Sequence, residues 1–469
     1  MLLTSFIGSL VIFTLVGIAS SFVKKNQTSD YLLAGQSVSP SFVGLSAAAS
    51  WCSGFMFIGQ IGFTYQRGLS SIWIMIGLIL GDLFVSQITH RRLRIKSEEL
   101  QQESYVEALL DSDSAIDNLT QKISVTLIST IAIVALIGYS AAQIMSSGVA
   151  LESILGVDYK VGALITTIVI TLYCFSGGIR ASIWTDFVQA TVMLIAMFIL
   201  VITAISHAGG LSGWSNSLKA TSEGYLSLFP PDLFNGNPLF LGFIILGWFA
   251  GGMGVAGQPH VMVRFMTLKD VKLINRARLY YYLYYTTLYL LAILAGLSAK
   301  IILPNLESHQ YEMALPMLSN LILPDFLIGV ILAGLFASTM STADSLIISS
   351  SATLTRDLIP KLKNSYFAVK LSTILLSLLA LALAIFSQST VFQLVIIFGG
   401  LLSASFAPVL ILKSLDYKIP PKSLIAMIAS SATLTTLWRE LGYSSIIYEV
   451  AIGMGAGLIV GLLLSKRVK

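Results

Sequence analysis

The chain has 469 residues, of which 55% are hydrophobic and only 11% charged, with a mean hydropathy of +0.84 and a net charge of +5. This composition supplies too little polar surface for a water-soluble globule of that length, so it indicates a multi-span membrane protein. The apolar runs are continuous over about 20 residues, as a helix needs to cross about 30 Å of hydrocarbon, and they do not alternate as lipid-facing strands do. We therefore expect an all-α membrane protein.

Hydropathy predicts thirteen spans along the chain. The first is hydrophobic enough to be mistaken for a signal peptide, but it lacks a basic start and a small-residue cleavage site, so we expect it to be retained. The predicted spans are 3–22, 41–64, 70–90, 122–151, 160–175, 183–206, 237–258, 273–299, 321–350, 366–386, 389–412, 421–437 and 444–465.

The distribution of Lys and Arg predicts the orientation, because basic loop residues concentrate on the cytoplasmic side. An outside N-terminus and a cytoplasmic C-terminus place most of the basic loop residues, among them Arg264, in the cytoplasm. This bias accounts for the positive net charge without a nucleic-acid partner, and we expect a multi-pass protein of the cell membrane, most simply a bacterial inner membrane. The exceptions, which face out, are Arg67, Lys160, Lys219, Lys300 and Arg439.

Two of the predicted spans carry runs of small residues. Residues 44–60, "GLSAAASWCSGFMFIGQ", are rich in Gly, Ala and Ser, and residues 247–260, "GWFAGGMGVAGQPH", hold five glycines and one proline. The segments lie five spans apart, as matching positions of two inverted repeats would, and interrupted helices at such positions point to a binding site at the middle of the membrane. The alternative is that the small residues only let helices pack closely.

The ninth span carries a row of hydroxyl groups at intervals of three and four residues, which a helix places on one face. Neutral oxygens on a buried face can replace part of the hydration shell of a monovalent cation, and this chemistry suits sodium better than a proton. The alternative is that each hydroxyl bonds to a carbonyl one turn earlier, which is common in membrane helices. The row consists of Ser338, Ser341, Thr342 and Ser345.

Asp82, Asp186 and Asp344 are candidate carboxylates inside predicted spans, where each is costly unless it is paired or functional. Asp186 lies at the start of the sixth span, where it could serve the helix N-terminus. Asp344 lies among the hydroxyls of the ninth span and could serve an ion or a neighbouring basic residue. Asp82 has no supporting pattern, and we expect it to be structural.

Cysteines and histidines do not suggest a catalytic or metal centre. Cys52 and Cys174 both fall within predicted spans, so no disulfide framework is expected. The four histidines are dispersed without metal-ligand spacing, which argues against a membrane enzyme. They are His90, His207, His260 and His309.

Five motifs, in this order, together resemble the sodium:solute symporter family, closest in pattern to its sodium/proline symporters. They are "DYLLAGQSVSP" at 30–40, "LSAAASWCSG" at 45–54, "GGIRASIWTDFVQA" at 177–190, "GQPHVMVRFM" at 257–266 and "MSTADSLIISSSATLTRDL" at 340–358. The resemblance implies the five-plus-five inverted-repeat fold of the bacterial leucine transporter in a single domain, 1–469. Helix 1 would be peripheral, 41–206 and 237–412 would form the two repeats, and 421–465 would add two C-terminal helices.

The resemblance also implies sites. In the family, carbonyls of the broken second span and a carbonyl and hydroxyls of the ninth bind sodium, which corresponds here to Ala49, Cys52, Ser338, Ser341 and Thr342. Some members bind a second sodium with an aspartate of the sixth span, which corresponds to Asp186, with Ser345 nearby. The solute pocket would include Ser53, Phe55, Gln258 and Pro259. No cofactor is implied, and sodium is the coupling ion.

The chain departs from the proline symporters around this pocket. Trp51 stands where they carry an acidic residue, and Phe55 stands where they carry a tryptophan. Gly251 and Val255 replace a tryptophan and a tyrosine, and Trp248 does not fill that position in register. Because losing two aromatic walls would enlarge or reshape the pocket, proline specificity does not transfer directly.

We therefore expect a secondary active transporter that couples sodium to a small organic solute by alternating access. Proline or a related amino acid is the first candidate solute, and a monocarboxylate, pantothenate, sialic acid or a sugar is the alternative. A membrane sensor built on a transporter-like domain is a further alternative, but it needs an output module that this sequence does not encode.

Overall fold

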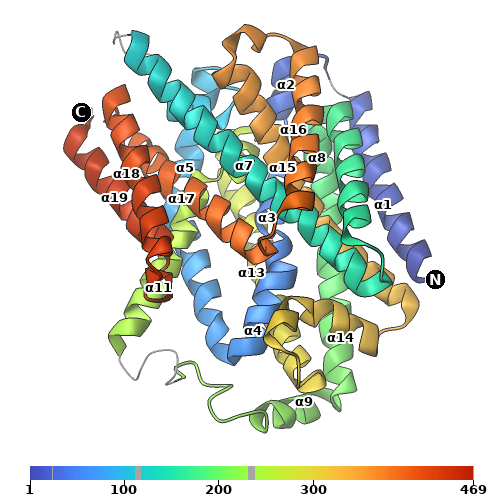
Figure 1. Cartoon of the computed structure of the whole chain (residues 1–469). Coiled ribbons are helices and arrows are strands. Elements are labelled where there is room, and N and C mark those ends of the chain that lie inside the picture. The colour runs from blue at the N-terminus through green and yellow to red at the C-terminus, as the bar shows by residue number, and fades with distance from the viewer. Residues whose placement is uncertain (24, 111–117, 231–237, 468–469) are drawn as a thin grey trace.

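The computed structural model describes the whole chain except residues 24, 111–117, 231–237 and 468–469, and it forms one helical bundle (Figure 1). Within the described residues, nine helical segments are long and apolar enough to cross a membrane. The long helices are α1 (Leu2–Ala19), α5 (Ile72–Glu99), α7 (Asn118–Leu155), α8 (Tyr159–His207), α11 (Pro238–Met253), α13 (Ile274–Ile302), α15 (Asp325–Ala352), α16 (Tyr366–Phe386), α17 (Val391–Ser414), α18 (Pro421–Glu440) and α19 (Glu449–Leu464).

Shorter helices connect these or form the broken parts of spans. They are α2 (Thr28–Leu33), α3 (Pro40–Trp51), α4 (Ile61–Arg67), α6 (Tyr105–Leu109), α9 (Gly210–Lys219), α12 (Pro259–Met266) and α14 (Ala314–Ile322). Two short strands, β1 (Tyr417–Lys418) and β2 (Lys466–Arg467), pair antiparallel. Proline occupies the first turn of α3, α12 and α18, where its missing N–H leaves no helical bond unmade.

Helices lie along all thirteen segments predicted to span the membrane, although the first residue of 237–258 lies outside the described residues. Two of the nine long segments, Phe55–Glu99 and Tyr159–His207, each include residues of two predicted spans, because a glycine reverses the chain without ending the helical run. Gly68, with φ +67°, separates α4 from α5, and Gly178, with φ +59°, divides α8. The two arms of α8 lie side by side, since Gly17 of α1 faces both Tyr173 and Thr185.

The second predicted span is broken, as expected. Helix α3 ends at Trp51, Cys52 leaves the helical conformation with ψ +63°, and a π-helical turn covers Phe55–Gln60 before α4 begins. The seventh span is broken later and over a shorter stretch. Here α11 gives way to a 3₁₀ turn over Gly254–Gly257, Gln258 is extended, and α12 follows. Both breaks lie in the buried interior, where unpaired backbone groups can face protein instead of lipid.

The glycine-rich run at 247–260 proves to be a break only in its second half. Helix α11 runs unbroken through Gly247, Gly251 and Gly252, and each of these glycines lets another chain segment approach closely. A Cβ at Gly252 would collide with the carbonyl oxygen of Leu78 on α5, whereas Gly247 and Gly251 face Tyr448. Close packing, the alternative interpretation of this run, therefore holds for these three positions.

This close packing leads to a stability prediction. We expect Gly252→Ala to lower the free energy of unfolding by about 1–3 kcal/mol, because the added methyl must push α5 and α11 apart. Gly242→Ala on the same helix is the matched control. Nothing lies within 4 Å of a Cβ at Gly242, so alanine there should be neutral or stabilising by up to about 1 kcal/mol. Thermal unfolding in detergent compares the two, and equal melting temperatures would refute the packing argument.

Candidate functional site

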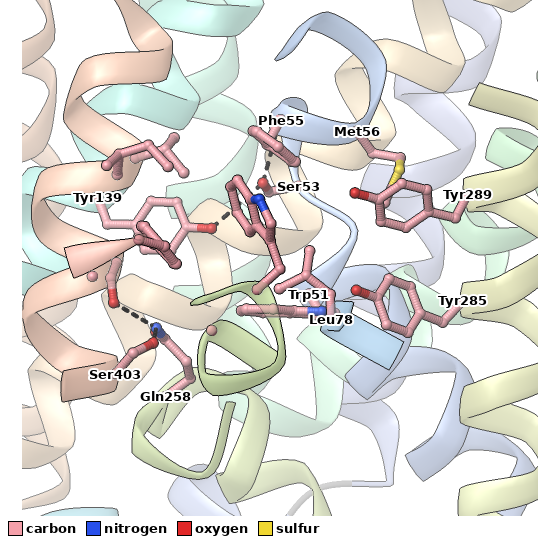
Figure 2. A pocket seen from close by; sticks show the side chains of 17 residues that line it. Trp51, Ser53, Phe55, Met56, Leu78, Tyr139, Gln258, Tyr285, Tyr289 and Ser403 are labelled. Atoms are coloured by element: carbon pink, nitrogen blue, oxygen red, sulfur yellow. Dashed lines mark hydrogen bonds between the residues drawn. The ribbon is translucent and has the colours of Figure 1, made fainter. Parts of the chain in front are cut away.

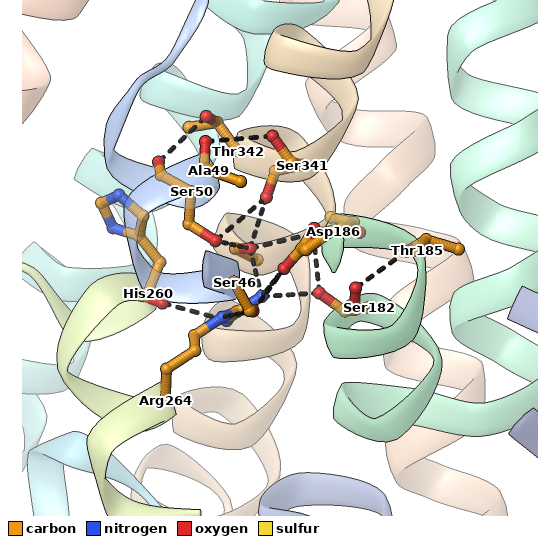
Figure 3. A network of polar contacts seen from close by, with 12 residues as sticks. Ser46, Ala49, Ser50, Ser182, Thr185, Asp186, His260, Arg264, Ser341 and Thr342 are labelled. Atoms are coloured by element: carbon orange, nitrogen blue, oxygen red, sulfur yellow. Dashed lines mark hydrogen bonds and ion pairs between the residues drawn. The ribbon is translucent and has the colours of Figure 1, made fainter. Parts of the chain in front are cut away.

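The row of hydroxyls on α15 faces the end of α3, just before the break (Figure 3). The Ser341 hydroxyl donates to the Ala49 carbonyl at 3.1 Å, and the Thr342 hydroxyl donates to the Ser50 carbonyl at 3.0 Å. Ser345 and Ser50 bond through their hydroxyls at 2.9 Å. These side chains are all fully buried, so two helices far apart in sequence present oxygen atoms to each other away from bulk water.

Both interpretations of the hydroxyl row apply at once. Ser341 and Thr342 also lie 3.2 and 3.1 Å from the Ser338 carbonyl, so each hydroxyl is shared between its own helix and α3. The Ser338 hydroxyl donates only to the Leu335 carbonyl one turn earlier, at 2.7 Å, so Ser338 faces the cluster with its carbonyl oxygen. The back-bonding alternative therefore describes the Ser338 side chain, whereas Ser341 and Thr342 also join α3.

Cys52 lies at the end of α3, beside this cluster. Its N–H donates to the Ala48 carbonyl at 2.8 Å, and its side chain is fully buried as a free thiol. The structure thus brings four of the five predicted sodium ligands, Ala49, Ser338, Ser341 and Thr342, into one bonded cluster, and leaves Cys52 as its neighbour. Carbonyl and hydroxyl oxygens are hard, neutral donors, which suit an alkali cation better than a soft metal.

Asp186 and Asp344 both lie close to the guanidinium of Arg264, and Figure 3 shows Asp186 beside Arg264. Arg264 Nη2 lies 3.3 Å from Asp186 and 3.8 Å from Asp344, and all three side chains are fully buried. Two carboxylates and one arginine in the interior need further hydrogen bonds to offset their lost hydration. Arg264 also donates to Ser46, Ser182 and Ser345 and to the carbonyl of His260.

The carboxylates have further donors of their own. Asp186 accepts from the Ser46 hydroxyl at 2.6 Å, and Asp344 accepts from Tyr173 at 2.8 Å and from Ser182 at 2.9 Å. Ser345 bonds to both Arg264 and Asp344, so it connects the carboxylate network to the hydroxyl cluster. The sequence leaves two roles open for Asp344, which are to bind an ion or to pair with a basic residue. These contacts show the pairing with a basic residue, Arg264.

The expectation that Arg264 is a cytoplasmic loop charge is wrong, because the residue is buried in the bundle. The orientation was predicted by counting the basic residues between spans, and Arg264 lies between two predicted spans. Such a count does not show whether a basic residue is paired with a carboxylate. The break at Gln258 redirects the chain, so that α12 carries Arg264 toward the two carboxylates. One signal was present in the sequence: the sixth and ninth spans each carry a carboxylate, which is costly in a membrane without a partner.

Asp82 joins α5 to a neighbouring helix, and the expectation that it is structural stays a prediction. It is fully buried on α5 and accepts hydrogen bonds from the hydroxyls of Tyr281 at 2.7 Å and Tyr282 at 3.1 Å, both on α13. These two tyrosines satisfy both carboxylate oxygens and join α5 to α13.

A cavity of about 70 Å³ lies on the other side of the α3 break (Figure 2). Three of the four predicted solute residues, Ser53, Phe55 and Gln258, line it, whereas Pro259 does not. Pro259 instead starts α12, where its ring fixes the first turn. Six of the fourteen remaining lining residues are aromatic. The other lining residues are Trp51, Met56, Leu78, Tyr139, Trp248, Gly251, Tyr285, Tyr289, Val395, Ile396, Gly399, Gly400, Ser403 and Tyr448.

Two polar lining residues, Ser53 and Gln258, lie at the two helix breaks, and each contacts a polar side chain of another helix. The Gln258 amide nitrogen donates to the Gly399 carbonyl at 2.8 Å and to Ser403 at 2.7 Å, and its amide oxygen is buried with no partner in the described structure. Tyr139 lies 3.4 Å from the Ser53 hydroxyl. Among the described residues that line the cavity there is no Asp, Glu, Lys, Arg or His, so this lining carries polar groups but no net charge.

Backbone N–H groups at the α3 break already have partners. The N–H of Gly54 donates to Gln143 at 2.9 Å, and those of Phe55 and Met56 donate to the side chain and carbonyl of Ser53. A solute carboxylate that approached this half-helix would therefore exchange with existing hydrogen bonds.

Several lining residues were missed by the sequence analysis. One of them, Tyr139, lies on α7, another, Ser403, lies on α17, and the third, Tyr448, directly precedes α19. All three helices are far from both breaks in the sequence. Trp248 does line the cavity, and its ring stacks on Tyr448 with centroids 4.7 Å apart. The loss of two aromatic residues is expected to enlarge or reshape the pocket, and the rings of Trp248 and Tyr448 line it beside Gly251.

The comparisons with known proteins agree on the family. The sequence model of the sodium:solute symporter family matches residues 31–418. The high-affinity proline transporter PutP of Bacillus subtilis (strain 168) is 31% identical over 459 residues, which cover 94% of this chain and 92% of the relative. A sodium/proline symporter of Staphylococcus aureus is 30% identical over 487 residues, which cover 98% of this chain and 92% of the relative.

Solved structures share the fold at low sequence identity. A Na⁺-coupled sialic acid symporter in a substrate-bound outward-open state matches 100% of this chain and 99% of its own, with a TM-score of 0.82 and 19% identity. Mhp1, a nucleobase-cation-symport-1 family transporter in a closed conformation, matches 92% of each chain with a TM-score of 0.59 and 13% identity. The bundle therefore has a leucine-transporter-like fold.

The family match spans most of the chain, and relatives at about 30% identity cover nearly all of it. The chain therefore belongs to the sodium:solute symporter family, as a multi-span membrane transporter that couples a solute to sodium and not as an enzyme.

Proposed function

We propose that this protein carries a small, net-neutral amino acid, with proline as the first candidate, into the cell together with sodium by alternating access. The single observation that supports this most is the placement of two sites on either side of one helix break. Ala49 and Ser50, at the end of α3, contact the hydroxyl cluster of α15. Trp51, Ser53, Phe55 and Met56, at the break and just beyond it, line the cavity.

The proposed sodium ligands are the oxygens of Ala49, Cys52, Ser338, Ser341 and Thr342. Carbonyl and hydroxyl oxygens that now share protons at 3.0–3.2 Å can turn toward one cation, because a hydroxyl rotates freely and carries two lone pairs. Such an ion would join α3 to α15 and hold the break in one geometry. The second predicted site, Asp186 with Ser345, stays a prediction, and Arg264 already supplies positive charge there.

The lining of the cavity supports a solute of zero net charge. An anionic solute, such as a monocarboxylate, pantothenate or sialic acid, would leave its charge without a cationic partner in this lining, at a desolvation cost of several kcal/mol. A zwitterion can place its ammonium group over the aromatic faces and its carboxylate toward the helix ends at the breaks. A sugar is the neutral alternative, and names of relatives at about 30% identity favour proline over it.

Coupling follows from the shared backbone between the two sites. When sodium fixes Ala49 to Cys52, it also fixes Ser53 and Phe55, so the solute meets a formed wall instead of a flexible one. In this proposal the helix bundle then rocks and both ligands leave inward, with the N-terminus outside. Each sodium ion that enters at a membrane potential of 100 mV contributes about 2.3 kcal/mol of driving force.

The test is uptake of radiolabelled proline by proteoliposomes with an inward sodium gradient, compared with choline. We expect sodium-dependent uptake that net-neutral amino acids compete with, and that lactate, pantothenate, sialic acid and glucose at equal concentration leave unchanged. Competition by an anion would refute the charge argument. Failure of every solute in the panel to enter with sodium would refute the proposal as a whole.

A further inference from the structure

Tyr448 lies outside both proposed repeats, yet it contributes a ring to the cavity. It precedes the first residue of α19, in the C-terminal pair of helices that sequence reasoning treats as an addition to the transporter core. Its ring stacks on Trp248 of α11, with centroids 4.7 Å apart and an angle of 24° between the planes. The carbonyl of the preceding residue, Ile447, accepts a hydrogen bond from the Trp438 indole at 3.0 Å, which ties this turn to α18.

Two glycines of α11, four residues apart on one helix face, make room for Tyr448. A Cβ at Gly247 would come within 2.8 Å of the Tyr448 backbone nitrogen, and a Cβ at Gly251 would come within 2.9 Å of its ring. The hydroxyl end of the ring points toward α17, where it lies 3.7 Å from a Cβ built on Gly400. The ring is therefore fixed on three sides, by α11, by α17 and by its own turn.

We propose that Tyr448 sets the upper size limit of the solute, and that the C-terminal helix pair is part of the solute site. This inference rests on the proposed function, because it assumes that the solute binds in this cavity. The ring occupies space that Gly251 leaves free, so removing the ring enlarges the cavity, and a larger residue at position 251 would compete with the ring for the same space.

The experiment compares sodium-dependent uptake of proline with that of pipecolic acid, whose ring is one methylene larger, in proteoliposomes. We expect the wild type and Tyr448→Phe to prefer proline and Tyr448→Ala to lose at least about tenfold of that preference in kcat/KM, the effect that one methylene has in a fitted pocket. Tyr448→Leu is a second variant that keeps an apolar contact with Trp248, and it should shift the preference in the same direction.

An exchange of the side chains at positions 251 and 448 distinguishes a direct effect of the ring on solute size from a general loss of folding or transport. Gly251→Phe alone should lose uptake of both solutes, because the new ring collides with Tyr448. Gly251→Phe combined with Tyr448→Ala supplies one ring from the other helix and should regain both uptake and the preference for proline. Sodium-dependent uptake with the same solute preference in wild type, Tyr448→Ala and Tyr448→Leu would overturn this inference alone. A wild type without sodium-dependent uptake would overturn the proposed function, and this inference with it.

Discussion

Replacement of Arg264 by methionine should lower the free energy of unfolding by about 3–5 kcal/mol, more than the loss expected for Gly252→Ala. The variant leaves Asp186 and Asp344 buried without their cation, and removing one partner of a buried ion pair costs far more than the pair contributes. Methionine keeps the apolar length of the side chain, so the lost stability arises mainly from the unpaired carboxylates and not from a cavity. Thermal unfolding of the purified protein in detergent measures the effect.

Arg92→Met is the matched control for that result. Arg92 pairs with Asp416 at 3.3 Å, but both side chains are largely exposed, at 50% and 42%, and such pairs are worth at most about 1 kcal/mol. We also expect Asp186→Asn to recover part of the stability lost in Arg264→Met, because it removes one of the two unpaired charges. Equal melting temperatures for Arg264→Met and Arg92→Met would contradict the account of the buried network.

The second large effect concerns sodium. In Ser341→Ala combined with Thr342→Ala, the sodium concentration that gives half-maximal uptake should rise at least about tenfold, the loss expected when groups at a metal site are removed. Both hydroxyls contact α3 carbonyls, so the change removes two proposed ligands and the contact between the helices. Uptake at a series of sodium concentrations, at constant ionic strength, gives the value.

Ser350→Ala provides the control on the same helix. The Ser350 hydroxyl is equally buried but donates only to the Leu346 carbonyl one turn earlier, at 2.7 Å. Its removal should leave the sodium dependence unchanged. If the double variant and Ser350→Ala show the same sodium dependence as the wild type, the hydroxyl cluster is not the sodium site.

The helices of this fold were predictable because long apolar runs in a bilayer have few alternatives to helix. The break in the second span was also predictable, since Gly, Ser and Cys interrupt an otherwise lipid-like segment. The glycines of the seventh span were less informative. Glycine permits both a break and a close approach, and only the positions of α5 and Tyr448 distinguish Gly251 and Gly252 from Gly254.

The candidate site was predictable where one helix carries the pattern, as with Ser341 and Thr342 on α15. Contacts made between distant segments were not, because periodicity within one helix says nothing of what faces it. Arg264 was assigned by its place between spans, and its two carboxylates lie 78 and 80 residues away in the chain. Tyr448 was missed for the same reason: it reaches the cavity from the C-terminal pair of helices.

We propose that sodium and solute bind together across the α3 break, and linkage between the two affinities is the direct test of this. We would measure binding of radiolabelled proline to the purified protein with and without sodium, and binding of sodium with and without proline. We expect each ligand to raise the affinity for the other by one common factor, of about 5- to 150-fold, and this factor to approach one in the double variant of Ser341 and Thr342. A proline affinity that is the same with and without sodium in the wild type would contradict it.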